Sequence, residues 1–255
     1  MGLLDGKNVL ITGVLTDASL AFGVAQLAQR EGANIILTGA GRGLRLTSKT
    51  ARKLDTEPEV LEFDVTNPEH VPAVRDHLQS TWGRVDAALH AIGFAPESCL
   101  GDDFMAAPWE DVKVAMEISA YSYKTLAEVV APLMTEGGSI VGLDFDATVA
   151  WPAYNWMGVA KAALESTNRY LAKSLGPDNI RCNLVAAGPI RTIAAKSIPA
   201  FAKFEDVWDD KAPLGWDVRD SSSVARSTVA LLSDWFPATT GSMIHVDGGY
   251  NAMGA

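Results

Sequence analysis

The stretch NVLITGVLTDASLA, residues 8–21, decides the fold class of this chain. It begins with the apolar run Asn8–Thr12, in which hydrophobic residues follow one another instead of alternating with polar ones. That pattern is typical of a parallel strand covered on both faces. Gly13 interrupts the run, and a helical pattern starts at Leu20. A buried strand, a short loop and a helix form the first unit of a doubly wound α/β fold.

The same unit recurs along the chain. Further strands are predicted at Asn34–Thr38, Glu59–Phe63, Val85–Ala91, Ser139–Leu143, Arg181–Ala186 and Met243–Val246. Helices are predicted at Leu20–Arg30, Pro68–Trp82, Asp111–Met134, Ala153–Leu175 and Ser221–Ser233. This alternation implies right-handed crossovers and one parallel sheet of about seven strands with helices on both faces, a Rossmann-type fold. We expect residues 1–255 to form a single domain. The segment 189–213 has no clear periodicity, and we interpret it as a lid over the binding site.

Composition and charge exclude several classes of protein. The 255 residues carry a formal net charge of −10, so the overall field repels phosphate, and we expect no nucleic-acid partner. No apolar stretch reaches the length of a membrane span and no secretory signal is recognisable, so we expect a cytoplasmic protein without a membrane partner. Cys99 and Cys182 lie far apart, which predicts two reduced thiols. The four histidines form no metal-binding motif, and we expect no metal.

Ligands of such a sheet bind beyond the carboxyl ends of the strands, so the loops that follow the strands matter most. In the first of these loops, Gly13 to Ser19, the backbone N–H groups at the start of the next helix can hold a pyrophosphate. Gly13 is the only glycine, however, so the GxGxxG pattern is missing. The alternative is a simple strand-to-helix turn capped by the hydroxyl of Ser19.

The loop Gly39–Gly43 approaches the adenosine ribose in this fold. An acidic residue there would accept a hydrogen bond from the ribose 2′-hydroxyl and favour NAD, but the loop contains none. Arg42 can pair with a 2′-phosphate instead, or can belong to a solvated turn. The choice between NADH and NADPH stays open at this point.

Later loops add polar groups. Asp64, after the third strand, can accept a hydrogen bond from the adenine amine, and Gly93, after the fourth, lets the backbone approach a cofactor closely. Tyr154 and Lys161 are seven residues apart, close to two helical turns, so they share one face. A lysine ammonium near a phenol stabilises the phenolate, so the hydroxyl of Tyr154 could act as an acid or donate a hydrogen bond to a developing oxyanion. The alternative is a core tyrosine followed by a surface lysine.

Several stretches of the chain together match a known family. They are Thr12–Gly13 with Ser19–Phe22, Ile92–Phe94, Ile118–Tyr123, Gly138–Gly142, Asp144–Asp146, Pro152–Met157, Leu184–Thr192, Ala230–Gly241 and Asp247–Gly249. On these motifs the chain resembles the enoyl-acyl-carrier-protein reductases, a divergent branch of the short-chain dehydrogenase/reductase superfamily, in particular the actinobacterial and mycobacterial type. Ordinary members of the superfamily use Tyr-x3-Lys, which is absent here, whereas this branch uses Tyr-x6-Lys, as in Tyr154 and Lys161.

The resemblance implies reduction of the trans-2 double bond of enoyl thioesters by NADH in type II fatty-acid synthesis. It implies that Tyr154 hydrogen-bonds the thioester oxygen, that Lys161 holds the nicotinamide ribose and that Phe145 directs the substrate over the nicotinamide. The implied cofactor contacts are Gly13, Ser19 and Leu20 at the pyrophosphate, Ala40, Asp64 and Val65 at the adenosine, and Ile92, Gly93, Lys161, Ile190 and Thr192 at the nicotinamide half. Phe94, Trp151, Met157 and part of the segment 193–213 would line the acyl pocket.

The resemblance also implies partners. The family is typically a homotetramer, and its substrate is carried by an acidic acyl carrier protein. Lys196 and Lys203 are candidate docking charges, although exposed lysines are ordinary on any surface.

The chain departs from the mycobacterial pattern in three places. Ala40-Gly41 replaces an aromatic-acid pair, Ala91 replaces a serine, and the segment between Thr192 and Pro213 is shorter. A shorter lid favours acyl chains of ordinary length. Two other functions fit the fold: a carbonyl reductase of the same superfamily, and a protein that senses nicotinamide redox state without turnover.

Overall fold

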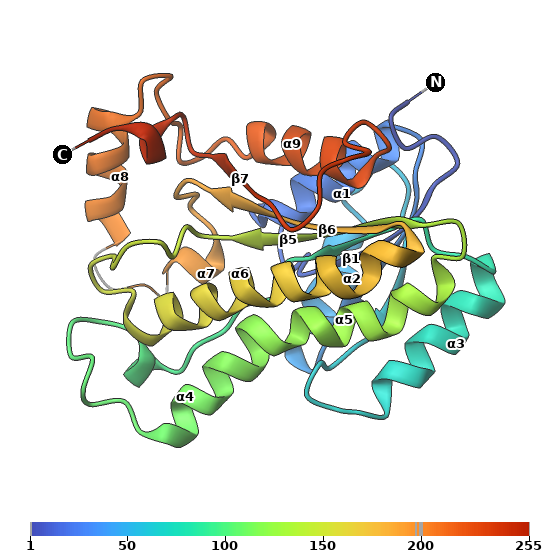
Figure 1. Ribbon diagram of the computed structural model, residues 1–255, viewed down its shortest axis with the longest axis horizontal. Helices are drawn as coiled ribbons and strands as arrows, with labels where there is room; N and C mark the ends of the chain where they lie inside the picture. Colours follow the sequence, from blue (N-terminus) through green and yellow to red (C-terminus); the bar gives the residue numbers. More distant parts are fainter. Residues whose placement is uncertain (1, 197, 199–200, 255) are drawn as a thin grey trace.

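Seven parallel strands form one sheet in the order β3-β2-β1-β4-β5-β6-β7 (Figure 1). The computed structural model of the protein describes residues 2–196, 198 and 201–254. The strands are β1 Asn8–Thr12, β2 Asn34–Gly39, β3 Glu59–Glu62, β4 Ala87–His90, β5 Gly138–Asp144, β6 Ile180–Ala187 and β7 Met243–Val246. The predicted Rossmann-type α/β class is confirmed, because the strand order reverses between β1 and β4 as in a doubly wound sheet.

Helices cover both faces of the sheet. One face carries α1 Leu20–Arg30, α2 Arg42–Ala51 and α9 Ser222–Leu232, and the other carries α3 His70–Trp82, α5 Ser122–Val130 and α6 Asn155–Leu175. The remaining helices are α4 Trp109–Met116, α7 Ile193–Lys196 and α8 Phe201–Lys211. Figure 1 shows α7 and α8 beyond the carboxyl end of the sheet, on the same side as the C-terminus.

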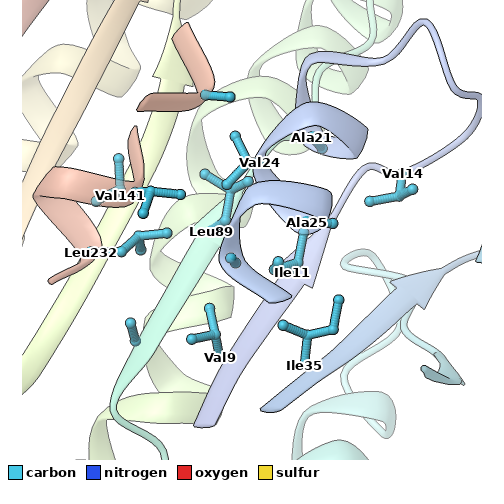
Figure 2. Packing of buried hydrophobic residues seen from close by; sticks show 14 of the residues in the cluster. Val9, Ile11, Val14, Ala21, Val24, Ala25, Ile35, Leu89, Val141 and Leu232 are labelled. Atoms are coloured by element: carbon cyan, nitrogen blue, oxygen red, sulfur yellow. The ribbon is translucent and has the colours of Figure 1, made fainter. Parts of the chain in front are cut away.

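The core around β1 explains why the first strand–helix unit forms. All five residues of β1 are buried. Helix α1 turns Ala21, Val24, Ala25 and Ala28 toward it, at the spacing of three and four residues that puts side chains on one helix face (Figure 2). Three of these four residues are alanines, so the helix axis can approach the sheet closely.

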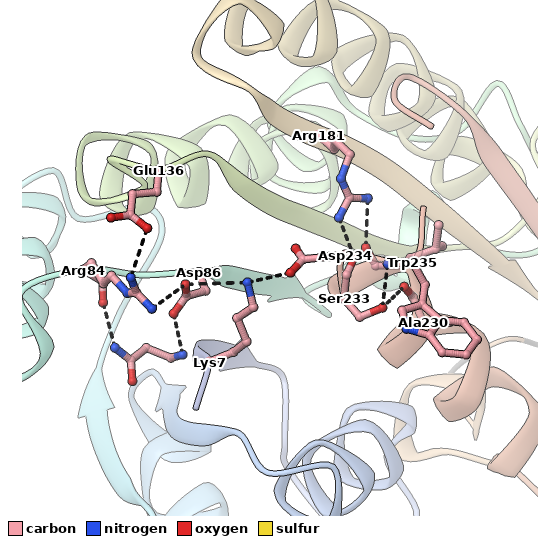
Figure 3. A network of polar contacts seen from close by, with 11 residues as sticks. Lys7, Arg84, Asp86, Glu136, Arg181, Ala230, Ser233, Asp234 and Trp235 are labelled. Carbon is pink, nitrogen blue, oxygen red and sulfur yellow. Dashed lines mark hydrogen bonds and ion pairs between the residues drawn. The ribbon is translucent and has the colours of Figure 1, made fainter. Parts of the chain in front are cut away.

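A polar network joins the amino ends of the strands (Figure 3). The ammonium of Lys7 lies 2.9 Å from the carboxylate of Asp234, and Arg84 forms ion pairs with Asp86 at 3.5 Å and with Glu136 at 3.2 Å. These pairs are partly exposed, so each one contributes little alone. These ion pairs lie at the amino ends of the strands. Ligands of this fold bind at the opposite edge of the sheet, beyond the carboxyl ends of the strands.

Three predictions about elements were incomplete. Helix α2 was not predicted, because Gly41 and Gly43 indicated a turn; Gly43 instead lies in the first turn of the helix, where an added Cβ would come within 3.2 Å of Leu15. The segment 189–213 lacks clear periodicity but forms α7 and α8. The predicted helix 111–134 is divided into α4, a π-helical turn at Glu117–Tyr121, α5 and a 3₁₀ turn at Ala131–Leu133.

Candidate active site

Thr12 and Gly13 connect the end of β1 to the end of β4, the two neighbouring strands at which the strand order reverses. The Thr12 hydroxyl donates to the carbonyl of Leu89 at 3.0 Å and accepts from the backbone N–H of Ala91 at 2.8 Å. Gly13 has a φ of 81°, and a Cβ at this position would lie 2.0 Å from the carbonyl oxygen of Ala91. Only glycine allows this approach, so the loops after β1 and β4 meet directly beneath the cleft.

The loop after β1 leaves the amino end of α1 open. Ser19 precedes the helix, but its hydroxyl accepts a hydrogen bond from the backbone N–H of Thr16 at 3.0 Å and does not cap α1. The alternative of a hydroxyl-capped turn is therefore wrong. The first turn of α1 contains no acidic residue, and Gly13, Ser19 and Leu20 line the cleft. Free N–H groups at a helix start suit an anion such as a pyrophosphate.

The π-helical turn at Glu117–Tyr121 fixes the loop after β4. The hydroxyl of Ser119, which is fully buried, accepts from the backbone N–H of Phe94 at 2.9 Å and donates to the carbonyl of the same residue at 2.8 Å. Ile92, Gly93 and Phe94 line the cleft. π-Helical turns inside α-helices are frequent at functional sites, and here the turn brings the hydroxyl of Ser119 against the loop after β4.

Tyr154 lies at the start of α6 between two residues with left-handed backbones. Ala153 has a φ of 58° and Asn155 a φ of 50°. The Asn155 amide donates to the carbonyls of Gly101 and Asp103, both at 3.2 Å. Non-glycine residues in this region cost on the order of 1 kcal/mol or more each, and such strain concentrates at functional sites. The contacts of Asn155 hold the turn in this conformation.

The surroundings of Tyr154 keep its hydroxyl protonated. The side chain is almost completely buried, and its ring packs edge-on against Phe145 with the centroids 5.2 Å apart. Burial, and after it the nearby carboxylate of Asp144, raises the pKa of Tyr154 well above its ordinary value. Among the described residues its hydroxyl has no hydrogen-bonding partner. Tyr154 is therefore a neutral donor whose hydrogen is available to a ligand.

Lys161 lies against the end of β5, beside a buried carboxylate. Its ammonium donates to the carbonyl of Leu143 at 3.1 Å and lies 3.5 Å from Oδ1 of Asp144. The Asp144 side chain is 0% exposed, and neither of its oxygens accepts a hydrogen bond of ordinary geometry. Burial raises the pKa of Asp144 to about 6, although the charge of Lys161 acts in the opposite direction. The predicted alternative of a surface lysine is wrong, because Lys161 is buried.

His90 is a second buried titratable group near Lys161. Its Nε2 lies 2.7 Å from the hydroxyl of Ser122, and its ring packs edge-on against Tyr123. Burial, and after it the charge of Lys161, lowers the pKa of His90 to about 3. The imidazole is therefore neutral at physiological pH, and Lys161 and Asp144 carry the charge in this part of the site.

Comparisons with known proteins agree with this geometry. The family model for enoyl-(acyl carrier protein) reductase matches residues 13–251. The enoyl-[acyl-carrier-protein] reductase [NADH] of Mycolicibacterium smegmatis is 48% identical over 97% of both chains, and that of Mycobacterium avium is 44% identical over 97% of both. The FabI enzyme of Escherichia coli K12, also named for NADH, is 36% identical over 98% of this chain and 96% of its own. The chain belongs to the enoyl-acyl-carrier-protein reductase family. The resemblance read from the motifs is thus confirmed.

This member of the reductase family brings most of the predicted site residues to one cleft. The predicted residues that line it are Gly13, Ser19, Leu20, Ile92, Gly93, Phe94, Phe145, Tyr154, Met157, Lys161, Ile190 and Thr192. They come from the ends of β1, β4, β5 and β6 and from the starts of α1 and α6. This is the edge of the sheet that the fold predicts for a ligand.

Four predicted residues do not line that cleft. Val65 lies in a separate groove between α3 and α5, and the carboxylate of Asp64 accepts hydrogen bonds from Thr66. The indole N–H of Trp151 donates to the carbonyl of Asp146, and its ring packs against that of Phe145. The fourth is Ala40. The contacts predicted for these four residues remain predictions. The side chains of Lys196 and Lys203 lie outside the described part of the structure.

The structure adds residues that the sequence did not single out. Asp144, Leu15 and Leu100 line the cleft; Ile198 and Phe201, which also line it, belong to the segment 193–213, part of which was expected to line the acyl pocket. The sequence does carry a signal for Asp144, since an acidic residue directly after a buried strand lies where ligands bind in this fold. Leu100 lies in a loop without any such pattern.

The residues that the structure describes contain no group of three or more His, Cys, Asp or Glu side chains arranged for a metal ion. None of the described helices is long and apolar enough to cross a membrane. Both cysteines are buried and free.

Proposed function

We propose that this protein reduces the trans-2 double bond of enoyl thioesters on acyl carrier protein, with NADH as the hydride source. One observation carries the proposal: Tyr154, with a free hydroxyl, and Lys161 line the same cleft as the open amino end of α1. The named relatives, which act on enoyl-acyl carrier protein with NADH, support it. NADH fits this cleft because the Gly13 loop and the uncapped helix start form a cradle for a pyrophosphate.

NADH, when bound, would supply the hydride for C3 of the substrate; negative charge would develop on the thioester oxygen, and a proton from water or from a protein group would then be added at C2. Tyr154 donates a hydrogen bond to that oxygen. Its raised pKa keeps the proton on the phenol, so the residue acts as a donor and not as a base. A single donor of this kind accounts for about a hundredfold to a thousandfold in turnover.

Lys161 positions the reactants. Its ammonium has three donors, of which one is used by the carbonyl of Leu143. The remaining donors are available to a ribose hydroxyl, and the carboxylate of Asp144 balances the charge from 3.5 Å away. Lys161 therefore contributes orientation and electrostatic stabilisation near the nicotinamide half of the cofactor.

The acyl chain of the substrate would occupy the apolar part of the cleft. Phe94, Phe145 and Met157 line this part together with Ile198 and Phe201. Apolar walls with a few polar groups are typical of small-molecule sites. We propose that the substrates carry acyl chains of ordinary fatty-acid length, because the lid segment is shorter than in the mycobacterial pattern. Comparable turnover of medium and long enoyl thioesters, with no requirement for very long chains, is the expected result.

A carbonyl reductase is the main alternative for this fold. Such an enzyme of the same superfamily uses Tyr-x3-Lys, but Gly158 follows Tyr154 by four residues. The test measures NADH oxidation with a trans-2-enoyl thioester and with a 3-oxoacyl thioester of the same length. Turnover of the enoyl substrate alone supports the proposal. Turnover of the 3-oxo substrate alone, or cofactor binding without turnover of either, refutes it.

We further propose that the protein works in the cytoplasm as a homotetramer and docks acyl carrier protein through Lys196 and Lys203. Exposed apolar side chains such as Met105, Trp109 and Tyr121 support burial of a surface in an assembly. Light scattering after gel filtration tests the tetramer.

Replacing both Lys196 and Lys203 by glutamate tests the docking of acyl carrier protein. It should raise KM for the carrier-bound substrate and leave KM for a coenzyme A thioester unchanged.

A further inference from the structure

Asp146 links the loop after β5 to strand β7. Its Oδ2 atom lies 3.3 Å from Nε2 of His245, a contact between residues 99 positions apart in the chain. Burial acts to raise the pKa of Asp146, but hydrogen bonds from Thr148 and the contact with His245 hold it below its ordinary value. The carboxylate is therefore ionised and can only accept, so Nε2 of His245 carries the hydrogen and donates it. Both side chains are partly buried, which strengthens the hydrogen bond relative to one on the open surface.

The register of the sheet brings His245 within reach of this loop. On β6, Ala186 is aligned with Asp144 of β5 and with His245 of β7, so the three side chains form one row across the sheet. The row lies on the face covered by α6, because Met243, two residues before His245, packs into the core of that face. The side chain between the two ends of the row is only a methyl group, so the imidazole can reach across β6 to Asp146.

Asp146 also orders the aromatic residues beside the reaction site. Its carbonyl accepts a hydrogen bond from the indole N–H of Trp151 at 2.5 Å. The ring of Phe145 packs against those of Trp151 and Tyr154, with the centroids 5.2 Å apart in both cases. A shift of Asp146 therefore reaches Phe145 along the backbone and through Trp151. From Phe145 the shift reaches Tyr154, the donor to the thioester oxygen.

Helix α6 holds the same loop from its other side. The carboxylate of Glu165 accepts from the backbone N–H of Ala147 at 2.9 Å. The loop is thus fixed from two elements, α6 through Glu165 and β7 through His245. Without the hydrogen bond from His245, Asp146 loses its link to β7 and the loop is held mainly by α6.

We propose that His245 is a positioning residue for the reduction, which holds Phe145 in place against Tyr154 through its hydrogen bond to Asp146. The inference rests on the proposed function and deepens it, because it assigns a role to a residue that does not line the cleft. His245 touches neither reactant, so it acts only through the loop. A shifted loop disturbs the alignment of the reacting groups more than it disturbs binding, so kcat should change more than KM.

Two substitutions at position 245 separate the hydrogen bond from the packing of the ring. His245→Phe keeps a ring of similar size but removes the donor. His245→Gln loses the ring but keeps a donor, since the amide nitrogen of glutamine reaches about as far as Nε2. His77→Phe is the matched control, because His77 of α3 lies 3.0 Å from Glu59 but does not line the cleft. The measurements are kcat and KM for a trans-2-enoyl thioester and the dissociation constant of NADH.

We expect His245→Phe to lower kcat about tenfold, less than the roughly hundredfold that a misplacement of about 1 Å can cost. KM and the binding of NADH should stay unchanged. His245→Gln should retain most of the wild-type kcat, and His77→Phe should match wild type. In a Phe145→Ala background, His245→Phe should add little to the loss, because the side chain through which it acts is absent.

Three results would overturn the inference. The first is a kcat of His245→Phe equal to that of wild type. The second is an equal loss in His245→Gln and His245→Phe, which would assign the effect to ring packing. The third is the full tenfold loss on top of Phe145→Ala, which would exclude the route through Phe145.

Turnover by the wild-type protein distinguishes this inference from the proposed function. If the wild-type protein does not reduce the enoyl thioester, the proposed function is wrong and the role of His245 fails with it. If wild-type turnover is present and the variants at position 245 match it, only the role of His245 is wrong.

Discussion

Asp144 offers the sharpest link between burial and function, and its replacement by asparagine tests that link. The carboxylate is fully buried, and its only charged neighbour at ion-pair distance among the described residues is Lys161. Burial raises its pKa from 3.8 to about 6. A shift of this size corresponds to about 3 kcal/mol, at 1.36 kcal/mol per pKa unit.

The sign follows from the direction of the shift. Because the folded-state pKa lies above the unfolded value, the neutral form favours folding, and that stabilisation is complete below about pH 4. It is lost as the pH rises through about 6, so at pH 8 the ionised group costs roughly 3 kcal/mol. Asparagine has the shape of the protonated carboxyl group. Asp144→Asn should therefore be more stable than wild type near pH 8 by up to that amount, with the difference closing near pH 4.

The same substitution should lower turnover, because Lys161 loses the charge that balances it. We expect the wild-type turnover rate to fall as the pH decreases through about 6. Asp144→Asn should be slower than wild type, and its turnover rate should show no such fall near pH 6. Urea unfolding at fixed protein concentration near pH 8 and near pH 4 measures the stability difference. A less stable variant at pH 8, or a difference of the same size at both pH values, would refute the reasoning.

Asp146 provides a matched control for this measurement. Burial acts to raise its pKa too, but hydrogen bonds from Thr148 and the contact with His245 outweigh that effect and hold the pKa below its ordinary value. Its contribution is present above the unfolded pKa and lost as the pH falls. Asp146→Asn should thus destabilise the protein near pH 8, the opposite of Asp144→Asn.

Substitutions at three further positions follow from the site. Gly13→Ala puts a Cβ 2.0 Å from the Ala91 carbonyl at a φ of 81°, and it should cost at least about 2 kcal/mol of unfolding free energy in urea; a change below about 0.5 kcal/mol would contradict the close approach. Asn155→Ala removes the amide that holds the turn of Tyr154, and it should lower kcat several-fold while KM changes less. Asn155→Asp lacks the amide donors but tolerates the left-handed backbone, so its kcat should lie between those of wild type and Asn155→Ala. Equal kcat in all three proteins would show that the Asn155 amide does not position Tyr154. Ser119→Ala leaves the backbone N–H of Phe94 without its partner and should destabilise the protein by about 1–3 kcal/mol while KM for the enoyl thioester rises; an unchanged KM would show that the π-helical turn does not position this loop.

The fold was predictable because its main signals are local. Continuous apolar runs such as Asn8–Thr12 and Asn34–Thr38 predicted buried parallel strands, and both are strands in the structure. The exceptions have physical reasons. Glycines at positions 41 and 43 hid α2, since Gly43 serves close packing against Leu15 and not a turn. Helix α8 buries Trp208 in an aromatic cluster with Tyr250, and stacking across such a sequence distance leaves no periodic pattern.

The site was predictable where residue spacing along one element carries the chemistry. The separation of Tyr154 and Lys161 placed both on one helix face, and both line the cleft. Long-range geometry was not predictable in this way. The left-handed backbone at Ala153 has no local signal, because alanine rarely adopts it. The burial of Asp144, which sets its pKa, depends on side chains from other elements, such as Lys161 of α6, that lie at the end of β5.

The most direct test of the proposed function compares Tyr154→Phe with Tyr170→Phe. Both residues lie on or beside α6, but Tyr170 is 71% exposed and far from the cleft. The measurement is kcat for NADH oxidation with a trans-2-enoyl thioester, with the dissociation constant of NADH determined on the same samples. We expect Tyr154→Phe to lose about a hundredfold or more in kcat with unchanged NADH binding, and Tyr170→Phe to match wild type. Equal kcat in the two variants would contradict the role of Tyr154 as the donor to the thioester oxygen.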